Sequence, residues 1–259
     1  MRVAALYDIH GNLPALEAVL EDVRNTGVDR IVVGGDVIPG PMPRETLTLL
    51  LGLEVPVQFI YGNGELAVLA QIAAKDSKAV TYWGTVSGEP LPEPLQEVLR
   101  WTGLQLHSEH EEILRTWPGT FEVDLPGMGK VLFCHGTPRS ETEGFTRLTP
   151  EDCLLPVFQG LAARLVVCGH THMQFDRMVG ATRVVNAGSV GMPFGRPGAD
   201  WLLLSGNIQL RHTSYDLASA ADRVRATQYP QAEEFAARSI LEPPSEEEMV
   251  RAFTNISFR

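Results

Sequence analysis

"RVAALYDIHGNLPALEAVLEDVRNTGVDRIVVGGD", residues 2–36, predicts a strand, a helix and a second strand in succession. The apolar run at each end is short and rich in Val, Ile and Leu, as in strands that are covered on both faces. Between the runs, Asn12 is a suitable helix N-cap, Pro14 lies in the first helical turn, and Gly27 ends the helix. A strand–helix–strand unit of this length favours a parallel or mixed sheet.

Short apolar runs punctuated by glycine continue along the chain. Helical patterns, PRETLTLLLG and GELAVLAQIAAK among them, separate the first three runs, and later runs lead to HG at 135–136 and GHTH at 169–172. Residues 173–188 and 200–216 predict two hairpins, the second turning at Gly206-Asn207. We expect both hairpins in the antiparallel part of a second sheet.

Residues 1–216 are expected to form the main domain. Residues 76–118 are polar, rich in proline and mostly helical in pattern, so they predict a helical insertion over one edge of the core. Residues 217–259 predict a helical C-terminal extension packed on the same domain.

Composition limits the class of protein. No run of about 18 apolar residues occurs, so we expect no membrane-spanning helix. Three cysteines without paired spacing argue against a disulfide framework and favour a cytoplasmic protein. The net charge of −11 argues against polymeric nucleic acid as a partner, but bound cations would still permit a small phosphorylated substrate.

Seven polar side chains follow the predicted strands, at the edge where open α/β sheets bind ligands. They are Asp8, His10, Asp36, Asn63, His135, His170 and His172. Carboxylate, imidazole and amide ligands without cysteine suit ions such as Mn²⁺, Fe²⁺ or Zn²⁺. Seven side chains exceed the needs of one tetrahedral ion and divide between two if one carboxylate bridges them. Such a pair activates water and stabilises an in-line displacement.

The ordered motifs D-I-H, G-D, G-N, H-G and G-H-T-H, followed by NAGSVGMP at 186–193, resemble the calcineurin-like metallophosphoesterase superfamily. The likeness covers residues 1 to about 216 and is greatest to its small bacterial and archaeal phosphodiesterases. It implies an α/β fold in which two β-sheets form a sandwich flanked by helices.

The resemblance also implies roles for the seven residues. Asp8, His10 and His172 would hold one ion, and Asn63, His135 and His170 the other. Asp36 would bridge them, and Asp36, Asn63 and His135 would take part in catalysis. The cofactor would be two divalent ions (Mn, Fe, Zn, Co or Ni), with manganese the first choice for assays.

One motif departs from the family pattern. Many members carry histidine after G-N, where it assists the leaving group, whereas this chain has Gly64. Three interpretations stay open: substrates with a leaving group that needs little protonation, replacement by another residue such as His107 or His110, or weak activity. His107 and His110 are otherwise solvated loop residues.

Other side chains are candidates for substrate contacts. Arg139 and Arg196 follow site loops and could pair with a phosphate, while Tyr7, Phe194 and Trp83 could stack on an aromatic ring. Core packing is the alternative for Tyr7.

The combined prediction is a dinuclear phosphodiesterase that uses a metal-bridging hydroxide. A phosphomonoesterase or protein phosphatase with the same site is one alternative, and a non-catalytic scaffold of the same fold is another. All seven ligand positions are filled, which favours the enzyme over the scaffold. Both a monomer and a homo-oligomer are compatible with the sequence.

Overall fold

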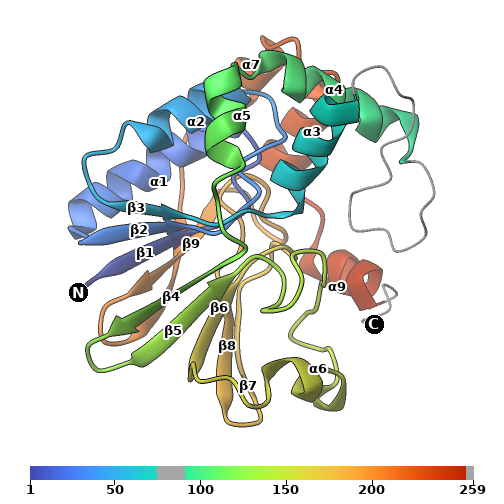
Figure 1. Ribbon diagram of the computed structural model, residues 1–259. Coiled ribbons are helices and arrows are strands. Elements are labelled where there is room, and N and C mark those ends of the chain that lie inside the picture. Colours follow the sequence, from blue (N-terminus) through green and yellow to red (C-terminus); the bar gives the residue numbers. More distant parts are fainter. Residues whose placement is uncertain (75–90, 255–259) are drawn as a thin grey trace.

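The computed structural model describes residues 1–74 and 91–254, which contain two five-stranded mixed β-sheets with helices on their outer faces (Figure 1). The sheets pack against each other through a shared apolar core. This arrangement confirms the two-sheet sandwich expected from the sequence.

The first sheet has the strand order β10-β9-β1-β2-β3. Its strands are β1 (Val3–Leu6), β2 (Arg30–Val33), β3 (Val57–Phe59), β9 (Ala199–Leu204) and β10 (Ile208–Thr213). The strands β1, β2 and β3 are parallel, as the repeated strand–helix pattern predicts. The helix α1 (Leu13–Thr26) connects β1 to β2, with the Asn12 side chain accepting the Ala15 N–H and Gly27 closing its end, as predicted.

The second sheet has the strand order β4-β5-β6-β8-β7. Its strands are β4 (Thr120–Leu125), β5 (Gly129–Cys134), β6 (Leu165–Cys168), β7 (Phe175–Val179) and β8 (Thr182–Asn186). The central strands β5, β6 and β8 are parallel, and β4 and β7 pair antiparallel at the two edges.

Both predicted hairpins form, but they lie in different sheets. The hairpin β7–β8 joins the second sheet as expected, whereas β9–β10 pairs antiparallel with β1 in the first sheet. The expectation for the second hairpin was wrong because strand alternation determines which face is buried and carries no information about the distant partner strand.

Alternate side chains of β1 are buried in two different apolar cores, one between the sheets and one under the outer helices. Val3 and Ala5 lie between the sheets, whereas Ala4 and Leu6 pack against the outer helices. Tyr7 continues the inner face, is fully buried, and donates its hydroxyl hydrogen to the Val167 carbonyl of the second sheet at 3.0 Å. Tyr7 is therefore a core residue that joins the sheets.

The remaining helices surround this core. They are α2 (Pro43–Leu51), α3 (Asn63–Ala74), α4 (Glu93–Gln105), α5 (Ser108–Leu114), α6 (Glu151–Phe158), α7 (Leu217–Arg225), α8 (Ala232–Phe235), the π-helix η1 (Ala236–Leu241) and α9 (Glu246–Thr254). Within the predicted insertion α4 and α5 are helical, and residues 76–90, including Trp83, lie outside the described residues. In the described ranges, no helix has both the length and the apolar character needed to span a membrane.

Candidate metal centre

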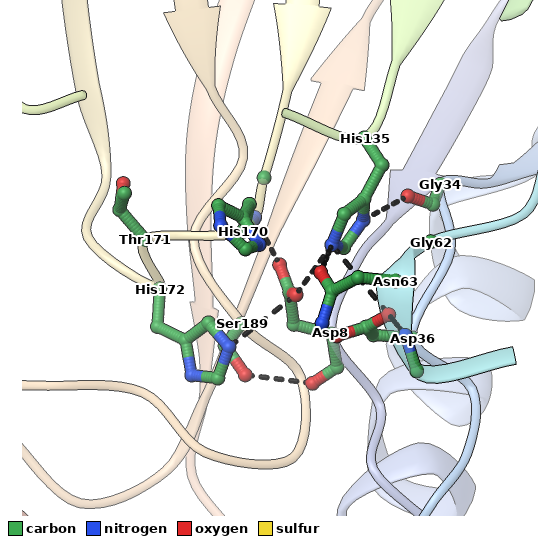
Figure 2. A network of polar contacts seen from close by, with 12 residues as sticks. Asp8, Gly34, Asp36, Gly62, Asn63, His135, His170, Thr171, His172 and Ser189 are labelled. Carbon is green, nitrogen blue, oxygen red and sulfur yellow. Dashed lines mark hydrogen bonds and ion pairs between the residues drawn. The ribbon is translucent and has the colours of Figure 1, made fainter. Parts of the chain in front are cut away.

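The candidate ligands meet where strand ends of the two sheets face each other (Figure 2). Asp8 and His10 follow β1, Asp36 follows β2, and Asn63 begins α3 just after β3. His135 follows β5, and His170 and His172 follow β6. The first sheet thus supplies the carboxylates, one imidazole and the amide, and the second sheet supplies the other three imidazoles.

Two groups of three side chains have the spacing of metal ligands. Asp8, His10 and His172 form one group, and Asp8, Asp36 and His135 form the other, with ligand atoms within 4.8 Å of one another in each. Asn63 adjoins the second group, since its Oδ1 lies 3.1 Å from His135 Nε2. The ring of His170 lies 5.1 Å from that of His135, measured between centroids.

Both carboxylates lie between the groups. Asp36 Oδ2 is 3.8 Å from His10 Nε2, and Asp36 Oδ1 is 3.6 Å from His135 Nε2. Asp8 Oδ1 lies 3.3 Å from His172 Nε2 and 3.7 Å from His135 Nε2. Asp8 belongs to both groups, which was not predicted from the sequence, whereas Asp36 belongs to the second group and also lies near His10 of the first.

Backbone carbonyls orient two of the imidazoles. His135 Nδ1 lies 2.9 Å from the Gly34 carbonyl oxygen, and His172 Nδ1 lies 2.9 Å from that of Met192. Because a carbonyl oxygen only accepts, each Nδ1 carries a proton, and each Nε2 faces the other candidate ligands. A hydrogen bond from the other ring nitrogen to a carbonyl is typical of metal-ligating histidines.

The carboxylates of this centre require positive charge. Burial opposes ionisation of Asp36, but His135 and His10 outweigh it and hold the pKa well below its usual range. Burial likewise opposes ionisation of Asp8, and His172 and His135 lower its pKa. Asp8 Oδ1 is buried and has no hydrogen-bond partner among the described residues. Two ionised carboxylates and an unsatisfied oxygen, surrounded by inward-facing imidazole nitrogens, fit divalent cations.

Comparison with known proteins agrees with this geometry. Residues 1–207 match the calcineurin-like phosphoesterase superfamily domain. This chain belongs to that superfamily. Its members are hydrolases of phosphoesters that use divalent metal ions.

Individual relatives resemble nearly the whole chain. A Methanocaldococcus jannaschii protein, the uncharacterised MJ0912, is 26% identical over 251 residues, which cover 88% of this chain and 94% of the relative. A crystal structure of the hypothetical protein PH1004 from Pyrococcus horikoshii OT3 has a TM-score of 0.74 at 22% identity, covering 94% of this chain and 99% of that one. A metallophosphoesterase from Sphaerobacter thermophilus gives a TM-score of 0.68 at 24% identity, with coverages of 92% and 97%. The two structures share the fold.

Glu65, in the first turn of α3, fixes the surrounding loops. Its buried carboxylate accepts backbone N–H groups from Gly62 and from Asp36, Val37 and Ile38, at 2.7–3.2 Å. Burial and the charge of Asp36 raise the pKa of Glu65 to about 7. This positioning role was not predicted from the sequence, because three of the four amides lie nearly 30 positions away.

Residues of the NAGSVGMP segment support the centre from the other side. Asn186 Nδ2 donates to the Gly169 carbonyl at 2.6 Å and to Thr171 Oγ1 at 3.1 Å. Ser189 Oγ donates to the Asp8 carbonyl at 2.7 Å. Thr171 points away from the neighbouring His170 and His172 (Figure 2).

The structure explains the glycine at position 64. A Cβ there would lie 2.1 Å from the Ile38 carbonyl oxygen and 2.9 Å from Asp36 Oδ1. Even an alanine would overlap the backbone of the β2–α2 loop, so a histidine at this position requires that loop to move.

Other sequence candidates have partners of their own. The Arg139 guanidinium pairs with Glu143 at 2.5–2.9 Å, and exposed Arg196 lies 3.6 Å from Asp200. His110 Nδ1 accepts the His107 N–H at the start of α5. His110 lies within α5 and His107 is the N-cap residue, so the expectation of two solvated loop residues was wrong for the half-buried His110.

Proposed function

We propose that this chain hydrolyses phosphodiesters with two divalent ions, by in-line attack of hydroxide on phosphorus. The observation that carries the proposal is the pair of ligand groups, which share Asp8 and have Asp36 between them. A single structural ion would not need seven converging side chains. The three cysteines, all free, fit the cytoplasmic location that the sequence favours.

The chain's own residues would position the reaction. Asp8, His10 and His172 would hold one ion, and Asn63, His135 and His170 the other, with Asp36 between them. When bound, such ions supply hydroxide at neutral pH and positive charge for the phosphoryl oxygens. The carbonyls of Gly34 and Met192 keep His135 and His172 in the tautomer that leaves Nε2 free for a metal.

The glycine that follows the G-N motif, Gly64, favours diesters whose leaving group needs little protonation. General acid catalysis is worth about 10²–10⁴-fold, and Gly64 has no side chain to supply it. The close approach of Gly64 to Ile38 O leaves no room for a replacement at that position. Esters of acidic alcohols, such as aryl phosphodiesters, need this proton least.

The test compares bis(p-nitrophenyl) phosphate with p-nitrophenyl phosphate, which release the same product. We expect Mn²⁺-dependent hydrolysis that is faster for the diester, and loss of more than ~100-fold in Asp36→Asn, since the variant keeps the shape but loses the charge. Asp176→Asn, which removes a surface carboxylate paired with Arg183, serves as the matched control.

Each other result selects an alternative. A preference for the monoester would favour a phosphomonoesterase or protein phosphatase. If the protein binds two ions and hydrolyses neither ester, the chain is a metal-binding scaffold or acts on a narrow substrate class, and the proposal for simple diesters is wrong.

A further inference from the structure

The C-terminal helix α9 reaches the candidate metal centre. A methyl group added at Gly144 would lie 3.4 Å from the Phe253 ring, from the His170 ring and from the Thr171 methyl. Phe253 and His170 therefore both border the space beside Gly144, which has no side chain to fill it. Phe253 comes from the segment beyond residue 207, outside the part of the chain that matches the superfamily domain.

A second phenylalanine lies against another candidate ligand. Phe194 stacks on His172, with 5.2 Å between ring centroids and an angle of 18° between the planes. His170 and His172 are the most exposed of the seven candidate ligands, and both phenylalanines are half-buried. The accessible side of the centre therefore has an aromatic ring beside each of its two outer histidines.

Two contacts fix α9 in this place. Arg147, in the loop between β5 and α6, forms an ion pair with Glu246 at the start of α9. The Gly195 N–H, next to Phe194, donates to the Pro244 carbonyl just before α9 at 2.9 Å. The helix lies beside the loops of the second sheet (Figure 1). The segment from Pro244 through α9 thus contacts both the loop of Arg147 and the loop of Gly195, which border the two outer histidines.

We propose that Phe194 and Phe253 determine specificity by binding an aromatic group of the substrate beside the metal centre. The proposal rests on the proposed phosphoesterase function and names its substrate class, esters that carry an aryl ring or a nucleobase. Such planar groups stack on aromatic side chains, and truncating the stacking side chain to alanine weakens binding by about 5–100-fold. Both rings are only half-buried beside the centre, so part of each is accessible to a bound group.

The test measures binding instead of turnover. Isothermal titration of the Mn²⁺-loaded protein with phenylphosphonate and with methylphosphonate compares two ligands that share the phosphonate and differ in the ring. We expect tighter binding of phenylphosphonate, and a ratio of the two affinities that falls about 5–100-fold in Phe253→Ala and in Phe194→Ala. A purely structural role would weaken both ligands equally and leave the ratio unchanged.

Control variants separate folding from recognition. Phe253→Leu and Phe194→Leu keep apolar bulk without the aromatic ring, and Leu148→Ala truncates an exposed side chain near Arg147. Metal content is measured for each variant, since Phe194 contacts His172. A ratio that is unchanged in both alanine variants, or equal affinities in the wild type, overturns the proposal.

One further titration concerns the kind of ring that the phenylalanines bind. Titration with adenosine monophosphate distinguishes a nucleobase from a simple aryl group as the ring that the phenylalanines bind. If the wild type hydrolyses no ester but the affinity ratio depends on the phenylalanines, the proposed reaction fails and the aromatic site stands.

Discussion

Five of the seven candidate ligands have a backbone conformation that L-amino acids rarely adopt. Asp8, His10, Asp36, His170 and His172 have φ between 48° and 66°, and they are the non-glycine residues with positive φ in the described chain. Such conformations cost of order 1–3 kcal/mol each and gather at functional sites. The strain turns each side chain toward the centre, so the geometry of this site is maintained against local backbone preference.

This strain predicts an inverted order of stability at His170. At an ordinary position in a helix or strand, a glycine makes the protein less stable than an alanine does, by about 0.5–1 kcal/mol. In the left-handed region the Cβ of alanine instead costs about 1–2 kcal/mol. We expect metal-free His170→Gly to be more stable than His170→Ala by about 1 kcal/mol in urea unfolding with EDTA. The ordinary order, with alanine the more stable, would show that φ near 66° is not maintained in solution.

The charge state of His135 gives a second prediction. Burial by itself lowers the pKa of this imidazole, but the carboxylates of Asp36 and Asp8 raise it to about 10. His135 is therefore protonated in the metal-free protein at pH 8, and a metal can bind Nε2 only after that proton leaves. Apparent metal affinity should rise as the pH increases from 6 to 9.

Nitrogen NMR of the histidine side chains measures this directly. At pH 8 the metal-free protein should show His135 as an imidazolium, assigned by its loss in His135→Gln, and Zn²⁺ should convert it to a neutral, coordinated ring. A neutral His135 at pH 8 without metal would contradict the prediction, because an unperturbed imidazole titrates near 6.5.

At the scale of elements, the centre depends on how closely α3 approaches the loop after β2. Gly64 N–H donates to Asp36 Oδ1 at 2.6 Å, and Glu65 accepts three N–H groups of the same loop. Both contacts require the first turn of α3 to touch the Ile38 backbone. Gly64 therefore permits the close packing of α3 on this loop, besides offering no side chain for acid catalysis.

Gly64→Ala should therefore destabilise the protein. The added Cβ would lie 2.1 Å from Ile38 O, and overpacking of this kind typically costs about 1–3 kcal/mol. Gly52→Ala is the matched control, because its Cβ would meet Thr48 O at 3.3 Å and its φ is −90°. Urea unfolding of both variants tests this, and an equal, small effect would mean that α3 shifts at no cost.

Elements were predictable where the signal is local. Asn12, Pro14 and Gly27 delimit α1 because capping and turn chemistry act within a few residues. The edge strand β4 was not predicted, although its half-buried Phe121 and Val123 alternate with exposed residues. The role of Glu65 was also not predicted, because most of its hydrogen-bond partners lie on another loop.

At the scale of the whole molecule, the site joins two sheets that are otherwise joined by apolar packing and a few bonds such as Tyr7 to Val167. The list of seven residues could be assembled from the sequence because each follows a strand, and parallel strand ends converge. Their division between the sheets could not be predicted, because the local pattern of a strand does not show which strands it pairs with. Long-range pairing is decided by packing over the whole core.

A centre shared by two sheets predicts that metal binding stabilises the entire fold. An ion that binds only the folded state at 100 times its dissociation constant adds about 2.7 kcal/mol, which for a chain of this size raises Tm by about 5–10 °C. Thermal unfolding with Mn²⁺ and with EDTA should show this rise in the wild type and in Asp176→Asn. The rise should be lost in Asp36→Asn, which removes the carboxylate between the two ligand groups. An equal rise in Asp36→Asn would place the ions elsewhere, and no rise at high metal concentration would mean that the folded state does not bind the ions preferentially.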